Sequence, residues 1–188
     1  IAIAKAASIY ENKKLYEYLT DSKDFKLPVP MMNILNGGAH ADNPINIQEF
    51  MIIPANFSSF RESLRAGAEV FKYLKENLKS KSLGTSVGDE GGFAPNLAST
   101  KDAIEIIIKS ISDAGYTSGK DIFLALDAAS SEFFEDSKYQ IEPHGEAENV
   151  EGMINFYEQL IRDYPVISIE DAMSEDCLLY TSDAADDP

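Results

Sequence analysis

Two apolar runs of similar pattern constrain the fold of this chain more than any other feature. They are "DIFLALD" at residues 121–127 and "PVISIED" at residues 165–171, and each ends in acidic residues. Between them, apolar side chains at residues 153–161 recur at the spacing of one helix face. Continuous apolar runs are typical of strands buried on both faces, and a helix between two of them is typical of a parallel sheet. The sequence therefore predicts an α/β fold in which both runs are buried strands of one sheet.

Four further elements precede these strands. "VPMMNIL" at residues 29–35 and "EFMIIP" at residues 49–54 are candidate strands. Their short, glycine-containing connection favours an antiparallel hairpin, because a parallel return needs about a dozen residues or more. Two helices follow. Ser59 and Glu62 form a candidate capping box for the first, and the second begins near Thr100.

Composition shifts divide the chain into three parts. Residues 1–26 combine a helical pattern with the start of a polar, proline-containing linker, so we place a domain boundary near Lys26. Residues 27–176 hold the alternating strands and helices. Residues 177–188, "CLLYTSDAADDP", lack either periodicity, and we expect a solvated or foreign tail. The missing initial Met suggests that the natural N-terminus lies upstream.

The charge of the chain excludes some partners. With 16 Lys and Arg against 32 Asp and Glu, the formal net charge is -16, so nucleic acid and anionic lipid are unsuitable ligands. An anionic substrate would need an intervening cation, and a metal is the simplest choice. A single cysteine, Cys177, excludes an internal disulfide, and no run reaches membrane-spanning length or forms a signal peptide. We expect a cytoplasmic protein.

Several polar residues fall where the predicted strands begin or end. Asp127 and Glu170 close the two buried strands, and carboxyl ends of parallel strands share one edge. Gln48 and Glu49 reach that edge only if their strand runs antiparallel. One acid at a strand end usually caps a helix or faces solvent, but two favour a shared site with oxygen ligands that suit magnesium. His40, in the connecting loop, gains interest because its loop lies near Glu49.

The string "SVGDEGGFAPN", residues 86–96, places Asp89 and Glu90 among three glycines. Glycine lets a backbone turn tightly or approach another group closely. The simplest interpretation is a solvated turn, and the alternative is a loop that holds an acid beside a substrate.

Five strings in this order and at these separations resemble the enolase family, the glycolytic phosphopyruvate hydratases: "LNGGAHADN", "IQEFMIIP", "SVGDEGGFAPN", "LALDAASSEFF" and "SIED". The resemblance covers residues 1–176 and ends at Cys177. It implies a partial TIM-like (βα) barrel of enolase type, with an opening strand–strand–helix–helix order and an antiparallel second strand. The helical end of a truncated N-terminal domain would precede it.

The resemblance also implies an activity and roles for the site residues. The family dehydrates 2-phosphoglycerate to phosphoenolpyruvate with two Mg²⁺ ions. By matching motif, Asp127 and Glu170 correspond to metal ligands, and Glu90 to the proton donor with Glu49 beside it. His40, Gln48 and Glu49 correspond to residues that line the substrate site.

The same resemblance indicates what this sequence lacks. The family's basic lysine, a third metal-binding carboxylate, a substrate arginine and a second lysine would follow Pro188, and a mobile serine loop would precede Ile1. We expect an internal fragment of a parent protein that forms homodimers or larger homo-oligomers, and we expect the fragment alone to be inactive.

Two alternatives remain open. Other magnesium-dependent members of the enolase superfamily, such as racemases or cycloisomerases, share acids at strand ends but should lack the glycine-flanked acid of the "GDEGG" loop. A surface-displayed or unconventionally secreted plasminogen-binding protein is the second, although the C-terminal lysines of that role are absent from this sequence.

Overall fold

The computed structural model describes residues 1–88, 90–142 and 144–177 of the chain. Asp89 and residues 178–188, which include most of the predicted tail, lie outside the described residues. The elements, in chain order, are α1 (Ala2–Tyr10), α2 (Leu15–Tyr18), β1 (Met32–Asn36), η1 (Gly38–His40), β2 (Glu49–Pro54), α3 (Phe60–Ser80), α4 (Thr100–Asp113), β3 (Ile122–Asp127), η2 (Ser130–Phe133), β4 (Phe134–Glu135), β5 (Lys138–Tyr139), α5 (Val150–Asp163) and β6 (Val166–Glu170).

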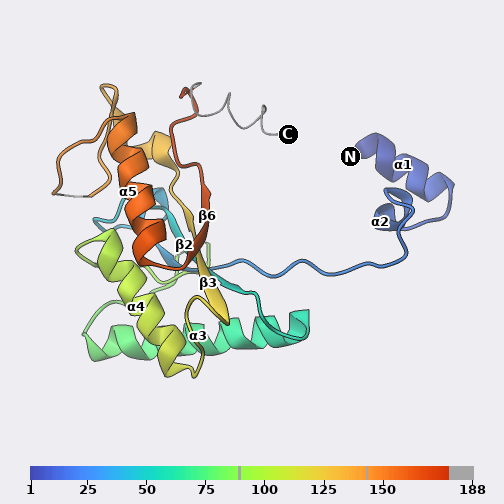
Figure 1. Ribbon diagram of the computed structural model, residues 1–188, viewed down its shortest axis with the longest axis horizontal. Helices are drawn as coiled ribbons and strands as arrows, with labels where there is room; N and C mark the ends of the chain where they lie inside the picture. Colours follow the sequence, from blue (N-terminus) through green and yellow to red (C-terminus); the bar gives the residue numbers. More distant parts are fainter. Residues whose placement is uncertain (89, 143, 178–188) are drawn as a thin grey trace.

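In the described part of the chain, four strands form one mixed sheet in the order β1-β2-β3-β6 (Figure 1). Strand β2 runs antiparallel to both β1 and β3, whereas β3 and β6 are parallel and joined through α5. Helix α3 packs on α4 and contacts β2, and α5 contacts β6. The sheet stays open, because β1 and β6 are its end strands and do not pair with each other. The fold is therefore α/β with an incomplete barrel wall.

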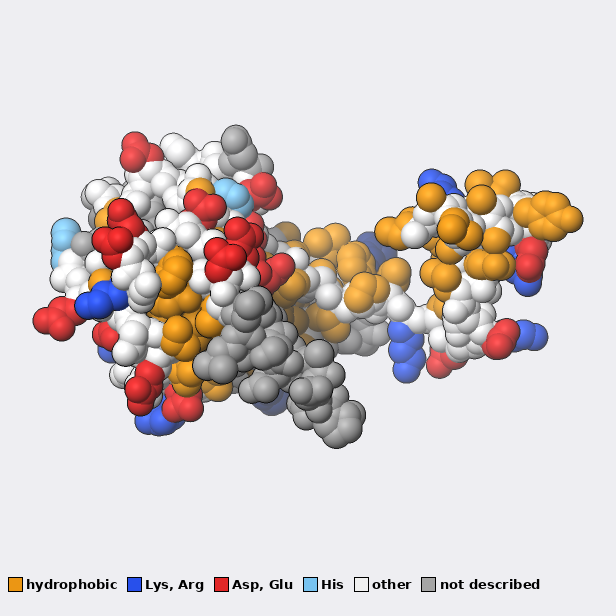
Figure 2. All heavy atoms as spheres, turned by 90° about the horizontal axis from the view of Figure 1, so that it is seen from above, with side chains coloured by type: hydrophobic (Ala, Val, Ile, Leu, Met, Phe, Trp, Pro, Cys, Tyr) orange, Lys and Arg blue, Asp and Glu red, His pale blue; other side chains and the backbone are white. Residues whose placement is uncertain are grey.

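Helices α1 and α2 stand apart from this body and pack on each other (Figure 1). Residues 20–31, which lead from α2 to β1, contain no helix or strand. Hydrophobic side chains cover much of the α1–α2 unit on the face seen in Figure 2, and Ile3 is 87% exposed. Among the described residues, no helix combines the length and apolarity needed to cross a bilayer.

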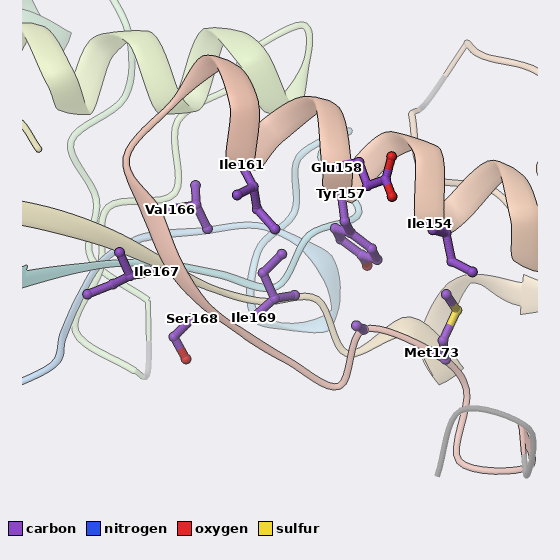
Figure 3. Close-up of a pocket in the computed structure, with 10 residues that line it drawn as sticks. Ile154, Tyr157, Glu158, Ile161, Val166, Ile167, Ser168, Ile169 and Met173 are labelled. Atoms are coloured by element: carbon purple, nitrogen blue, oxygen red, sulfur yellow. The ribbon is translucent and has the colours of Figure 1, made fainter. Parts of the chain in front are cut away.

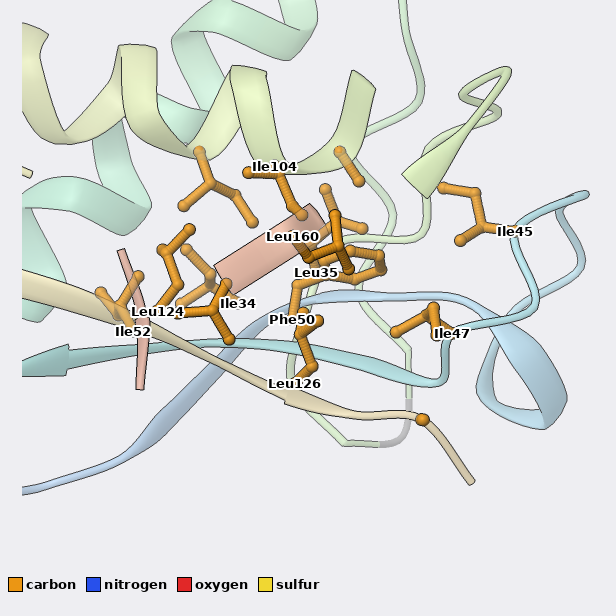
Figure 4. Close-up of a cluster of buried hydrophobic side chains, with 14 of the residues drawn as sticks. Ile34, Leu35, Ile45, Ile47, Phe50, Ile52, Ile104, Leu124, Leu126 and Leu160 are labelled. Carbon is orange, nitrogen blue, oxygen red and sulfur yellow. The ribbon is translucent and has the colours of Figure 1, made fainter. Parts of the chain in front are cut away.

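The strands bury alternate side chains beneath the helices. Phe50 and Ile52 of β2 and Leu124 and Leu126 of β3 are almost fully buried in the core, together with Ile104 of α4 (Figure 4). Side chains of a strand alternate between its two faces, so their neighbours in sequence project from the opposite face of the sheet. That second face carries the polar side chains at the strand ends.

Serine residues fix the starts of the two long helices. The Ser59 hydroxyl accepts a hydrogen bond from the Glu62 backbone N–H at 3.3 Å, and Ser99 accepts one from Asp102 at 3.1 Å. Each bond satisfies a donor that the first helical turn leaves without an intrahelical partner. The Ser59 cap of the predicted box is confirmed, while the Glu62 carboxylate binds Arg65 at 2.8 Å.

The prediction that both apolar runs are buried on both faces holds for β3 but is wrong for β6. Val166 is 5% exposed, but Ile167 is 56% exposed, and Ser168 and Glu170 are also exposed. The reason is position in the sheet: β6 is an edge strand, and in the described part of the chain no further strand pairs with its outer side. A sequence pattern records how apolar a strand is, not which neighbour covers it.

An apolar groove of about 440 Å³ lies between α5 and β6. Figure 3 shows Ile154, Tyr157 and Ile161 projecting from α5 toward the strand. Its lining includes one carboxylate, Glu158, and otherwise consists mostly of aliphatic side chains. The groove lacks the convergent polar groups that chemistry on an anion requires, so we do not place the functional site there.

The exposed edge predicts self-association of the chain. Ile167→Lys is expected to make it more monomeric at high concentration, because a lysine on an edge strand opposes strand pairing and breaks the apolar patch. Light scattering coupled to size exclusion over a range of concentrations would measure this. Leu64→Lys, at a 49% exposed site on α3, is the matched control and should leave association unchanged. Equal effects of both variants would show that net charge alone sets the behaviour.

Candidate active site

Three carboxylates lie side by side across the sheet. Glu49 of β2 is the register partner of Asp127 of β3, and Asp127 is the partner of Glu170 of β6. Directly opposed residues of neighbouring strands project from the same face. Glu49, Asp127 and Glu170, here called the acidic row, therefore share the face opposite the helix-covered core. The antiparallel direction of β2 makes this possible, because it brings the start of β2 to the ends of β3 and β6.

Hydrogen bonds at both carboxylate oxygens orient Asp127. Its Oδ1 accepts from the Ala129 backbone N–H at 3.1 Å, and its Oδ2 accepts from the Gln48 side-chain amide at 3.3 Å. The Gln48 backbone N–H also donates to the Asp127 carbonyl at 3.1 Å. Gln48 thus stands next to the acidic row, where the sequence placed it, and it holds the central acid of that row.

Glu49 meets His40 on its other side. His40 Nδ1 lies 3.5 Å from Glu49 Oε1, an ion-pair distance when the imidazole is protonated. The contact lacks hydrogen-bond geometry, and Nδ1 is buried with no hydrogen-bond partner among the described residues. Both side chains are less than one-third exposed. His40 is therefore brought to the acidic row by the turn η1, as its loop position suggested.

The surroundings of Glu49 raise the pKa of its carboxyl above the ordinary 4.5. Burial is the largest cause, followed by the negative charge of Asp127, with smaller contributions from Glu90 and Glu170; His40 opposes them. Burial and like charges both disfavour a carboxylate anion. Glu49 therefore experiences the other three predicted acids as neighbours, which is the arrangement that a shared site requires.

A pH-dependent stability follows from Glu49 in the metal-free chain. The folded state binds its proton more tightly than the unfolded state, so stability is greatest below the unfolded pKa and falls as pH rises through the folded pKa. Glu49→Gln cannot ionise and should gain in melting temperature over the wild type between pH 4 and pH 7, where the wild type ionises. Thermal unfolding in EDTA at several pH values measures the difference. The exposed Glu146→Gln should show no such trend, and a pH-independent gain for Glu49→Gln would contradict the argument.

Glu90 lies on a loop that is seated beside the start of this row. The Glu90 backbone carbonyl accepts from the Asn33 side chain at 3.4 Å, and Glu90 is exposed. The chain continues into Phe93, whose backbone N–H donates to Ile34 of β1 at 3.0 Å. Asp89, the other acid predicted on this loop, lies outside the described residues.

Strained backbone follows two members of the row. Ala129 and Asp171 have φ angles of 47° and 48°, in the left-handed region that disfavours residues other than glycine. Four other described non-glycine residues, away from the row, share this region: Asn12, Ser82, Asp136 and Ser137. Ala129 and Asp171 line a cavity of about 490 Å³ that also includes Gln48. Asp enters this region more often than most residues and Ala does so rarely, so the residue types alone give little signal for the pair.

The donor set can be tested against magnesium. In the described part of the chain, no three His, Cys, Asp or Glu side chains converge closely enough to hold a metal ion by themselves. Asp127 and Glu170 nevertheless supply two carboxylates from neighbouring strands, and Mg²⁺ is commonly held by one or two carboxylates plus water and substrate oxygens. The residues present therefore fit part of a magnesium shell.

Comparison with protein families agrees with this geometry. A family model described as the enolase C-terminal TIM barrel domain matches residues 24–182. The match includes every residue of the acidic row, the Glu90 loop, His40 and Gln48. It begins within the predicted linker and runs to residue 182, past Cys177, where the resemblance was expected to end. By this match over most of its length, the chain belongs to the enolase C-terminal TIM barrel domain family.

Proposed function

We propose that the protein containing this chain is a magnesium-dependent lyase that dehydrates 2-phosphoglycerate to phosphoenolpyruvate. The observation that carries the proposal is the register of Glu49, Asp127 and Glu170, which gathers three acids beside the Glu90 loop. The family match supports the enolase superfamily, and the glycine-flanked acid of the loop favours this dehydration over the racemase or cycloisomerase reactions.

The reaction needs two proton movements. A base takes the proton at the carbon next to the carboxylate, the carbon–carbon double bond forms, and the hydroxyl on the neighbouring carbon leaves with a proton as water. Loss of the first proton adds negative charge to a group that is already anionic. Magnesium, when bound at Asp127 and Glu170, supplies the positive charge that lets an acidic edge hold such an anion.

The residues of this chain serve the leaving-group side of that reaction. Glu90 is the proposed acid that gives its proton to the departing hydroxyl. Glu49, with its raised pKa, is the neighbour that shares protons with it. His40 and Gln48 flank Glu49 and Asp127 and are proposed to line the substrate position.

No residue of this chain is proposed as the base. In the family that role belongs to a lysine on a later barrel strand, and no position of this sequence matches that motif. We therefore propose that the base comes from a part of the protein outside this sequence and, from the family resemblance, that the protein is a cytoplasmic homo-oligomer. The chain alone is expected to give no turnover, because the proton next to the carboxylate would stay in place.

The experiment compares two proteins with the same substrate. The full-length protein and the 188-residue chain are each mixed with Mg²⁺ and 2-phosphoglycerate, and the absorbance of the enol phosphate is followed. A magnesium-dependent rise in absorbance is expected with the full-length protein and not with the 188-residue chain. Absence of product from the full-length protein would refute the proposed substrate, and turnover by the chain would refute the assignment of the base to a missing lysine.

A further inference from the structure

The loop that carries Glu90 rests on a residue without a role so far, Asn36. Asn36 ends β1 and is completely buried. A Cβ atom placed on Gly88 would lie 2.8 Å from Asn36 Nδ2, and one placed on Gly92 would overlap Asn36 Oδ1. The loop backbone therefore touches both ends of one carboxamide, and only glycine leaves room for that contact.

Two neighbouring amides tie Asn36 to the loop. Asn33 Nδ2 donates to Asn36 Oδ1 at 2.6 Å and also to the Glu90 carbonyl at 3.4 Å. Asn43 Nδ2 donates to the Asn36 carbonyl and to the Pro95 carbonyl, both at 3.0 Å. Asn33 thus joins the Asn36 side chain to the backbone of Glu90, while Asn43 joins the end of β1 to the far end of the loop.

Backbone hydrogen bonds close the loop on itself and onto β1. The Gly88 N–H donates to the Gly92 carbonyl at 2.9 Å, and the Asn36 N–H donates to the Phe93 carbonyl at 2.8 Å. Phe93 is itself buried against the core. These bonds fix the two ends of the loop, so the contact with the Asn36 carboxamide determines where the tip with Glu90 lies.

Asn36 also stands in line with the acidic row. It is the register partner of Glu49, so it occupies the same line across the sheet as the three acids. The Asn36 amide oxygen can accept the hydrogen bond from Asn33 without adding a fourth negative charge to the acidic row. Its Nδ2 is buried with no partner among the described residues, so the amide is held through its oxygen and by packing.

We propose that Asn36 is a positioning residue, which sets the place of Glu90 relative to Glu49 through the glycine loop and Asn33. The structural part of this inference stands by itself, and its effect on turnover rests on the proposed function. Asn36 touches the loop and not the reacting atoms, so it acts through Glu90.

The structural part is tested by hydrogen exchange of the chain, which needs no activity. Asn36→Ala should accelerate exchange in residues 86–94 and leave α3 unchanged, because it removes both the acceptor for Asn33 and the contact with the two glycines. Asn33→Ala removes the same link without emptying a buried site, so it decides the question if Asn36→Ala fails to fold. Unchanged loop exchange in folded Asn36→Ala, or in Asn33→Ala, would overturn the inference.

A pair of glycine substitutions makes the test specific. The Cβ of Gly88→Ala would lie 2.8 Å from Asn36 Nδ2 and 3.1 Å from the His40 carbonyl oxygen, so Asn36→Ala in the same chain should recover part of the lost protection. Gly92→Ala is the matched control, because its Cβ also lies 2.8 Å from the Leu35 backbone nitrogen and 3.0 Å from the Ile34 carbonyl carbon. Asn36→Ala should not rescue that variant. Equal rescue of both, or of neither, would contradict the proposed contact.

The catalytic part is tested in the full-length protein. Asn36→Ala should lower kcat on 2-phosphoglycerate by about 10²-fold with little change in KM, the size expected for a catalytic group displaced by about 1 Å. A loosened loop with unchanged kcat would overturn the positioning role. If the wild type does not act on 2-phosphoglycerate, the proposed function fails, while the exchange results still decide the contact between Asn36 and the loop.

Discussion

Glu90→Gln in the full-length protein is expected to lower kcat on 2-phosphoglycerate by about 10²–10⁴-fold, the usual contribution of a general acid. Glutamine keeps the size of the side chain but has no proton of suitable acidity for a departing hydroxyl. The KM should change little, because Glu90 is exposed on a loop and the negative charge of the substrate would be held by the Mg²⁺ that Asp127 and Glu170 are proposed to bind. Steady-state kinetics with saturating Mg²⁺ measure both constants.

A second measurement separates loss of the proton donor from loss of the site. Exchange of the proton next to the carboxylate with deuterated solvent reports the base alone, so it should persist in Glu90→Gln while water elimination fails. Glu146→Gln, at another exposed loop acid, is the matched control and should keep full activity. A Glu90→Gln enzyme with wild-type kcat would remove Glu90 from the reaction.

The local elements of the fold could be predicted from the sequence because their signals are local. The Ser59 cap, the helix that begins at Thr100 and the strand limits at Glu49–Pro54 all follow from neighbouring residues. The buried face of α3 was less predictable. Its second half buries Leu74 and Leu78, but Leu64 nearer the start is 49% exposed, and there the helix packs through the small residues Ala66 and Gly67. Small side chains allow a close approach that hydrophobicity does not report.

The sequence predicted the residues of the candidate site only to the extent that it predicted the directions of the strands that carry them. Acids at the carboxyl ends of β3 and β6 predict a shared site at that edge of the sheet. Glu49 lies at the same edge only because β2 pairs antiparallel with β3. The register that aligns Glu49 with Asp127 and Glu170 depends on how the strands pair, so no single stretch of the sequence predicts it. Asn36 was missed for a related reason: a polar residue at the end of "NILN" has an ordinary appearance until the loop 52 positions later packs on it.

Asp127→Asn is expected to remove most of the stabilisation that magnesium gives to the chain. In the wild type the acidic row is a cluster of like charges, so Mg²⁺ at Asp127 and Glu170 should stabilise the fold, by about 2.7 kcal/mol at 100 times the dissociation constant. The variant loses a ligand and should lose most of that gain. It also relieves the repulsion that raises the pKa of Glu49, so its metal-free form should be the more stable one.

The crossing of these two effects distinguishes metal binding from general screening. Melting temperatures in EDTA and in excess Mg²⁺ are compared for the wild type, Asp127→Asn and the control Asp171→Asn, which removes an exposed acid next to the row. Screening would lower the magnesium response of both variants equally, because each loses one charge. Site binding spares Asp171→Asn and reverses the stability order of wild type and Asp127→Asn when the metal is added. A magnesium response in Asp127→Asn equal to that of the wild type would exclude Asp127 as a ligand and leave the acidic row without the cation that its charge requires.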